Sequence, residues 1–198
     1  SLALHIFKPR NMQAGEKRPA IVYFFGGGWK LGTPIQFYRE CAYYASKGMV
    51  AVSVDYRIGY LHHSTPFESF EDAKDAICWL RSHASDYQLD PDKIAVAGGS
   101  AGGHLAAALG TIGSDETVPA GYRPNLSVLY YPVVDMVSRG YGFPEIKRDF
   151  EKISPIHHVS EATPSTLILL GTKDPIVSVE TIEAYQDKLL QKGVDCEL

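Results

Sequence analysis

The chain of 198 residues has the length of one domain, and its 45% hydrophobic and 21% charged residues are ordinary globular usage. Its formal net charge of −4 gives no electrostatic basis for binding nucleic acid or an anionic membrane, and no apolar stretch approaches the ~20 residues of a membrane span. The three cysteines, Cys41, Cys78 and Cys196, lack metal-type spacing. Because the chain begins at Ser1 and not at Met, a cytoplasmic protein and a secreted one that has lost a signal peptide both stay open.

Strand-like and helix-like segments alternate from one end of the chain to the other. Short apolar and β-branched runs predict strands at 2–7, 20–25, 49–54, 94–97, 126–131 and 166–170, and a further strand opens at 194–198. Apolar residues at helical spacing predict helices at 35–47, 67–85, 104–109 and 179–191. Because strands that alternate with helices pair in parallel through crossover connections, we expect a single α/β domain over residues 1–198.

Residues 136–162 are the least regular stretch of the chain. Glycine and proline recur in it, at Gly140, Gly142, Pro144 and Pro155. Two interpretations stay open: a small flap over a site, since long irregular segments in compact domains are often functional, or a simple connection.

Residues 98–102, Gly-Gly-Ser-Ala-Gly, form a G-x-S-x-G motif between the predicted strand at 94–97 and the predicted helix at 104–109. In a nucleophile elbow the serine occupies a strained strand-to-helix turn that leaves no room for side chains two residues away, so glycine stands on both sides. The Ser100 hydroxyl then projects above the sheet. The N–H groups that open the helix point to the place where an oxyanion would form.

A glycine-rich loop, Gly26-Gly27-Gly28-Trp29, follows the predicted strand at 20–25. Three glycines let the backbone approach a ligand and leave N–H groups uncovered. A dinucleotide site requires G-x-G-x-x-G at the start of a helix, and the third glycine of that pattern is missing here. An oxyanion loop explains why this sequence coexists with an elbow serine.

Asp174 follows the predicted strand at 166–170, at the sheet edge where sites assemble in α/β proteins. A carboxylate there can orient a histidine and stabilise its imidazolium form, as a catalytic triad requires. The alternative is an aspartate that starts a turn or a helix. The chain order, with Asp174 after Ser100 and after an oxyanion loop, favours the triad.

Taken together, these stretches closely resemble the hormone-sensitive-lipase-like and acetyl-esterase branch of the α/β-hydrolase superfamily, and the resemblance covers nearly all of the chain. The stretches that carry it are 25–29, 52–58, 90–105, 154–159 and 169–177. The resemblance implies a three-layer sandwich with a mostly parallel sheet and helices on both faces. It also implies that Ser100 is the nucleophile, Asp174 the triad acid, and the backbone N–H groups of Gly27, Gly28 and Ala101 the oxyanion donors.

The chain departs from that family's pattern in two ways. The family usually has histidine where Phe25 stands, a change that bears on loop geometry and not on the chemistry. The larger departure is the base, because the family places its histidine after one further strand and no histidine follows Asp174 in this chain. His104, one helical turn after Ser100, is expected to be a packing residue. We therefore expect a chain truncated at its C-terminus and trimmed at its N-terminus, which lacks the final strand and the triad histidine beyond Leu198.

The resulting hypothesis is a serine carboxylic-ester hydrolase that acts through an acyl-enzyme and needs no metal or cofactor. The resemblance favours short-chain, acetyl-type esters of sugars or aryl alcohols as small-molecule substrates, with Trp29, Tyr56 and Tyr60 as candidates for lining the pocket. Two alternatives stay open: a non-catalytic hydrolase-fold binding protein, and an amidase or peptidase with the same triad. Without the histidine, the chain alone is expected to be weakly active or inactive.

Overall fold

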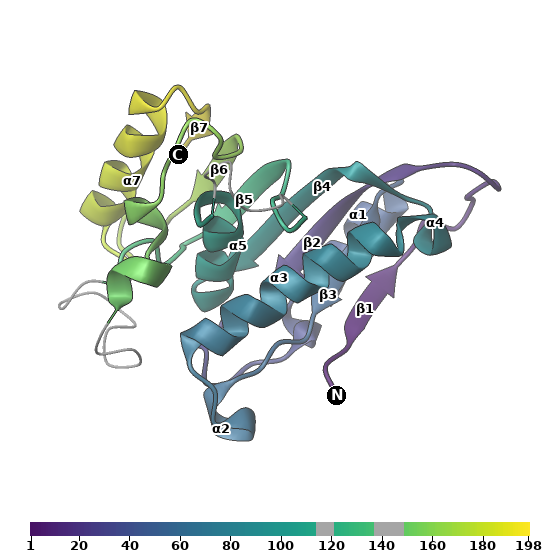
Figure 1. Cartoon of the computed structure of the whole chain (residues 1–198), viewed down its shortest axis with the longest axis horizontal. Helices are drawn as coiled ribbons and strands as arrows, with labels where there is room; N and C mark the ends of the chain where they lie inside the picture. The colour runs from purple at the N-terminus through teal and green to yellow at the C-terminus, as the bar shows by residue number, and fades with distance from the viewer. Residues whose placement is uncertain (114–120, 137–148) are drawn as a thin grey trace.

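The computed structural model describes residues 1–113, 121–136 and 149–198, and these residues build one seven-stranded sheet (Figure 1). The strand order across the sheet is β1-β3-β2-β4-β5-β6-β7. The strands are β1 (Leu4–Phe7), β2 (Arg18–Phe24), β3 (Val50–Val54), β4 (Leu89–Gly99), β5 (Leu126–Tyr130), β6 (Thr166–Leu169) and β7 (Cys196–Glu197). β1 pairs antiparallel with β3, and the other neighbouring pairs are parallel. The predicted α/β class is confirmed.

Helices cover both faces of this sheet. They are α1 (Tyr38–Ser46), α2 (Gly59–His62), α3 (Pro66–Ser82), α4 (Ala84–Tyr87), α5 (Ala101–Thr111) and α7 (Val179–Gln191), with short 3₁₀ turns η1 (Pro34–Phe37), η2 (Phe150–Ile153) and η3 (Pro155–His157). In Figure 1, α3 and α5 lie in front of the sheet and α1 lies behind it. On the α1 face the ring of Phe37 stacks on Tyr23 of β2, 4.8 Å between centroids.

The central strands form the core because they are apolar on both faces. All five residues of β3 and the last five of β2 are buried, as expected for strands covered by helices on each side. Their carboxyl ends, with those of β4, β5 and β6, meet at one edge of the sheet, since these strands run parallel. The loops at that edge carry the candidate site residues.

The α1 layer does not extend over β5 and β6. Leu126, Leu167 and Leu169 are 41%, 38% and 44% exposed. In the parallel register Val128 pairs with Leu167 and Tyr130 with Leu169, so these apolar side chains share one face of the sheet. We call this surface the β5–β6 face.

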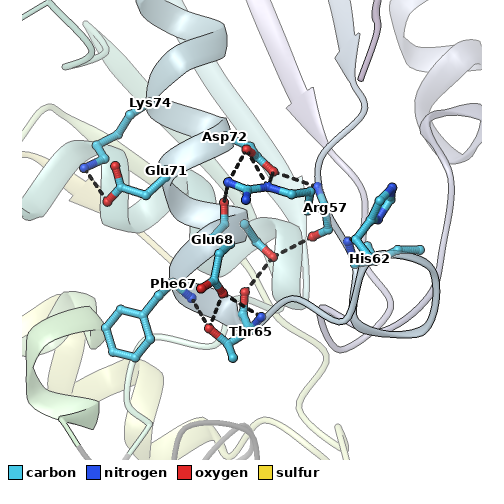
Figure 2. A network of polar contacts seen from close by, with 10 residues as sticks. Arg57, His62, Thr65, Phe67, Glu68, Glu71, Asp72 and Lys74 are labelled. Carbon is cyan, nitrogen blue, oxygen red and sulfur yellow. Dashed lines mark hydrogen bonds and ion pairs between the residues drawn. The ribbon is translucent and has the colours of Figure 1, made fainter. Parts of the chain in front are cut away.

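Helix α3 begins at Pro66 for reasons that are visible in its first turn. Thr65 is the N-cap, and its hydroxyl accepts a hydrogen bond from the Phe67 N–H. Glu68 accepts from the Thr65 N–H at 2.7 Å, which completes a capping box (Figure 2). Proline is favourable at the first helical position because its missing N–H has no intrahelical partner there.

Several boundaries differ from the sequence-based prediction. β4 runs from Leu89, well before the predicted 94–97, because its first residues pair with the start of β2. The predicted helix at 35–47 is a 3₁₀ turn followed by α1, and α2 was not predicted. The strand expected to open at 194–198 is β7. Of the predicted flap at 136–162, residues 137–148 lie outside the described part of the chain.

Candidate active site

Ser100 occupies the junction between β4 and α5 in a strained backbone conformation, with φ +55° and ψ −118°. Non-glycine residues adopt such angles only where the surroundings hold them. The Ser100 N–H donates to the carbonyl of Tyr130 at 3.0 Å, and the Ser100 carbonyl accepts from the His104 N–H at 2.9 Å. The backbone on both sides of the serine is thus fixed by β5 and by the first turn of α5.

Gly102 lets α5 sit directly on the sheet. A Cβ atom at this position would collide with the carbonyl oxygen of Phe24 and lie 2.5 Å from that of Phe25. These are backbone atoms of β2 and the loop after it, so they cannot swing aside. Ala101, which begins α5, is fully buried at this junction.

The glycine-rich loop after β2 lies opposite the elbow. A Cβ built on Gly26 would be 3.4 Å from the Cβ of Ser100. Gly27 has φ +139° and no space for a side chain, because a Cβ there would collide with the carbonyl oxygen of Leu31. The N–H groups of Lys30 and Leu31 both donate to the Gly27 carbonyl, at 3.1 Å, and this closes the loop into a turn.

The loop is anchored by residues from three other segments. The Gly26 N–H donates to Gln36 Oε1 at 2.6 Å, and the Tyr56 hydroxyl donates to the Phe25 carbonyl at 2.6 Å. The Gly59 N–H donates to the Trp29 carbonyl at 2.8 Å, where α2 begins. At Phe25, where the resembling family has histidine, the ring stacks on Tyr56 with centroids 4.1 Å apart.

Three backbone N–H groups at this place have no acceptor among the residues that the structure describes: those of Gly27, Gly28 and Ala101. Gly27 and Gly28 are partly exposed, and the Ala101 N–H belongs to the first turn of a helix, where no intrahelical carbonyl is available. Uncommitted N–H groups beside a serine hydroxyl are suited to binding an oxyanion.

His104 bridges the elbow helix to the rest of the molecule. Its Nδ1 accepts from the Trp29 indole N–H at 3.3 Å, and its Nε2 lies 2.7 Å from the Ile153 carbonyl, to which it donates. Burial lowers the pKa of His104 to about 4. A neutral ring with both nitrogens committed is a packing element, in line with the sequence-based expectation.

Asp174 lies in the turn after β6. Its Oδ1 accepts from the N–H groups of Ile176 and Val177, at 2.8 and 2.9 Å. These bonds, that from Val177 first, hold the pKa of the Asp174 carboxyl below its usual range. In the described part of the chain Oδ2 has no hydrogen-bond partner. The turn that sequence analysis kept as an alternative therefore exists, and it leaves one carboxylate oxygen available.

Neither Ser100 nor Asp174 bonds to a histidine ring within the described residues. His158 bonds to the Glu151 carbonyl, and His157 lies 3.8 Å from an Asp135 oxygen. His62 Nδ1 accepts the Ile58 N–H, within α2 and its N-cap. The same residues hold no group of three or more histidine, cysteine, aspartate or glutamate side chains placed to bind a metal ion.

The three predicted pocket residues lie in different surroundings. Trp29 and Tyr56 are 1% and 0% exposed, so neither has surface for a substrate in this structure. Tyr60 is 72% exposed on α2, and its N–H donates to the Lys30 carbonyl at 3.1 Å. Aromatic type alone therefore did not separate buried residues from exposed ones.

A polar network joins the segment just before α2 to helix α3 (Figure 2). The Arg57 guanidinium donates to both oxygens of Asp72, at 2.8 to 3.0 Å, and the Arg57 N–H also donates to Asp72, at 2.8 Å. Ser69 donates to the Arg57 carbonyl at 2.8 Å. Asp72 raises the pKa of Arg57, which stays charged. This network positions the segment whose Gly59 N–H binds the glycine-rich loop.

Two residues near the elbow, Gln36 and Tyr131, were not predicted from the sequence. Gln36 follows a proline in a short 3₁₀ turn, and nothing in the local pattern marked it. Tyr131 follows β5 at the sheet edge where sites assemble, and this position was the available signal.

Comparison with known proteins agrees with this geometry. Residues 4–142 match the family model described as BD-FAE. The chain is 29% identical to the esterase LipC of Mycobacterium tuberculosis over 94% of this chain and 51% of that protein. It is 26% identical to an acetylxylan esterase of Xylanibacter ruminicola over 90% of this chain and 38% of that protein. The chain thus spans about half the length, or less, of these curated relatives.

Among solved structures, esterase 2 from Thermogutta terrifontis matches with a TM-score of 0.91 and 37% identity, over 100% of this chain and 75% of that one. Propionate-bound and butyrate-bound structures of the same esterase match with TM-scores of 0.90 and 0.91. The mostly parallel sheet and the helices on both its faces are therefore those of an α/β-hydrolase.

Proposed function

The chain belongs to the BD-FAE family and has the α/β-hydrolase fold, and from this membership we propose that the protein is a serine carboxylic-ester hydrolase that works through an acyl-enzyme. The observation that carries the proposal is the geometry at Ser100. A serine in a strained strand-to-helix turn faces a loop whose Gly27 and Gly28 N–H groups have no acceptor among the described residues. Such strain is retained where it aims a side chain at a substrate.

In the proposed reaction the Ser100 Oγ attacks the ester carbonyl while a histidine takes the hydroxyl proton. The carbonyl oxygen becomes an oxyanion, which the N–H groups of Gly27, Gly28 and Ala101 stabilise; one such donor contributes about 3 kcal/mol or more in comparable sites. The histidine passes its proton to the leaving alcohol as the carbon–oxygen bond breaks. Water then attacks the acyl-enzyme by the same steps, which releases the acid and restores Ser100.

Asp174 is the proposed partner of that histidine. Its Oδ1 is occupied by two backbone N–H groups that fix the carboxylate and keep it ionised, and Oδ2 remains for the imidazole. A fixed carboxylate orients the ring and stabilises its protonated form.

We propose that the histidine follows Leu198 in the complete protein. The seven histidines of this chain have rings that are bonded elsewhere or lie in other parts of the chain, and no histidine ring bonds to Ser100 or Asp174 in the described structure. The β5–β6 face, with its three exposed leucines, supports the proposal, because a helix or strand that follows β7 would bury it.

Short acyl esters are the proposed substrates, with acetyl esters of sugars or aryl alcohols first. The name of the acetylxylan esterase relative and the propionate and butyrate in the related esterase structures support small acyl groups. These are properties of those proteins, and they enter here as the basis of the proposal.

The test assays the complete protein on 4-nitrophenyl acetate and on the matching anilide. Ser100→Ala is expected to lower kcat by at least a thousandfold, and Asp174→Asn, which keeps an oxygen acceptor but loses the charge, by about a hundredfold or more. Faster hydrolysis of the anilide than of the ester would favour the amidase alternative. Hydrolysis unaffected by Ser100→Ala would reject the mechanism.

A further inference from the structure

We propose that Tyr131 is a substrate-binding residue that selects the alcohol portion of the ester. This inference rests on the proposed function and goes beyond it, because it assigns a specificity-determining side chain and the kind of alcohol that the side chain prefers. Three observations carry it: the strained backbone of Tyr131, the position of its phenol against the elbow, and its place along the sheet edge.

The backbone of Tyr131 is strained in the same way as that of Ser100. Its φ is +38°, and a bulky residue rarely adopts a positive φ. Two other non-glycine residues with positive φ, His63 and Gln88, end the short helices α2 and α4, where this conformation is common. Tyr131 ends no helix, and its spatial neighbour Ser100 is the proposed nucleophile. The strained backbone of Tyr131 therefore lies at the candidate active site.

Hydrogen bonds on both sides hold this strained turn in place. The Tyr131 N–H donates to the carbonyl of Leu169, at the end of β6, at 2.7 Å. The preceding carbonyl, that of Tyr130, accepts the Ser100 N–H at 3.0 Å. The turn therefore connects the strand that precedes Asp174 to the nucleophile itself, and a shift of either one moves the tyrosine.

The phenol lies directly against the residue before the nucleophile. A Cβ built on Gly99 would be 2.9 Å from the Tyr131 hydroxyl oxygen and 3.1 Å from the ring carbon that carries it. Glycine at this position leaves the space that the phenol occupies. The side chain is still 43% exposed, and its hydroxyl has no hydrogen-bond partner in the part of the chain that the structure describes. A free donor thus stands beside Gly99, the residue that precedes the proposed nucleophile.

The strand order decides which part of a substrate meets this hydroxyl. Along the carboxyl edge the order is β2 with the glycine-rich loop, β4 with Ser100, β5 with Tyr131, and β6 with Asp174. The oxyanion donors of the loop lie on the β2 side of the serine. The histidine held by Asp174 protonates the leaving alcohol, so the alcohol portion lies on the β6 side. Tyr131 stands between Ser100 and Asp174, on the side of the alcohol.

The chemistry of a phenol favours an alcohol that carries further hydroxyl groups. The hydroxyl can donate to or accept from a hydroxyl next to the ester, and the ring offers an apolar surface to the carbon–hydrogen face of a sugar. A simple alkyl alcohol, which has no hydroxyl group besides the esterified one, gains no hydrogen bond from the phenol oxygen. The inferred class is therefore the acylated sugar.

The test compares two acetates that share the acyl group and differ in the alcohol, ethyl acetate and an acetylated xyloside, in the complete protein. Tyr131→Phe is expected to lower kcat/KM for the xyloside by about fivefold, the effect of one neutral hydrogen bond, and to change that for ethyl acetate by less than about twofold. Tyr43→Phe, on exposed Tyr43 of α1 outside the candidate site, is the matched control and should leave the ratio of the two kcat/KM values unchanged.

Equal losses on both acetates would show that Tyr131 only supports the elbow and would overturn the inference, and no loss on either acetate would also overturn it. In both cases Ser100-dependent hydrolysis of ethyl acetate would leave the proposed function standing. If neither acetate is hydrolysed in a Ser100-dependent way, the proposed function fails, and this inference fails with it.

Discussion

The junction of β4 and α5 brings together three constrained residues, Ser100, His104 and Tyr131. Ser100 and Tyr131 have positive φ, and His104 is fully buried with both ring nitrogens bonded. The motif around Ser100 could be identified from sequence, because glycine spacing reports the crowding of an elbow. The role of Tyr131 could not, because it depends on a neighbour that is distant in sequence, Gly99.

The buried state of His104 predicts a pH dependence of stability. Its ordinary pKa of 6.5 falls to about 4 in the folded protein. Between these values the unfolded chain binds a proton that the folded chain does not, so the free energy of unfolding decreases as pH falls from about 6.5 to about 4. The difference between the two pKa values corresponds to about 3 kcal/mol. Urea denaturation at pH 7 and pH 4.5 measures this loss.

The variant His104→Gln isolates the contribution of His104, because glutamine has a donor and an acceptor but does not titrate. We expect a smaller decrease in unfolding free energy between the two pH values in this variant than in the wild type. His63→Gln, at an exposed position, should keep the full decrease. Identical pH dependence in the wild type and in His104→Gln would contradict a neutral buried histidine.

At the level of elements, the approach of α5 to β2 sets the position of Ser100. Gly102→Ala places a Cβ on the Phe24 carbonyl, and we expect a loss of unfolding free energy of about 2 kcal/mol or more, since backbone cannot move aside as a side chain can. Gly171→Ala is the matched control, because nothing lies within 4 Å of the added Cβ. If the two variants gave the same denaturation curve, the helix would have room to shift, and the prediction would be wrong.

The strands were easier to predict than the short connecting elements. β2 and β3 are buried on both faces, so nearly every residue is apolar and the run is visible in the sequence. The four-residue helix α2 has no buried residue and hence no apolar period. Its place is set by contacts with Trp29 and by the Arg57–Asp72 ion pair (Figure 2), which only the folded chain brings together.

In the whole molecule, the site is built where five parallel strands end, and the order of these strands places the loop, the serine and the aspartate along one edge. This order follows from long-range pairing, which no local pattern in the sequence indicates. No helix among the described residues is long and apolar enough to cross a membrane. That residues 1–198 form one domain remains our proposal, in line with the single sheet.

The central claim is that Ser100 is an activated nucleophile. A fluorophosphonate probe reacts covalently with such a serine, and peptide mass spectrometry of the labelled complete protein locates the adduct. The account predicts one adduct, on the peptide that carries Ser100, and none in Ser100→Ala. An adduct on a different residue, or equal labelling of Ser100→Ala, would contradict it.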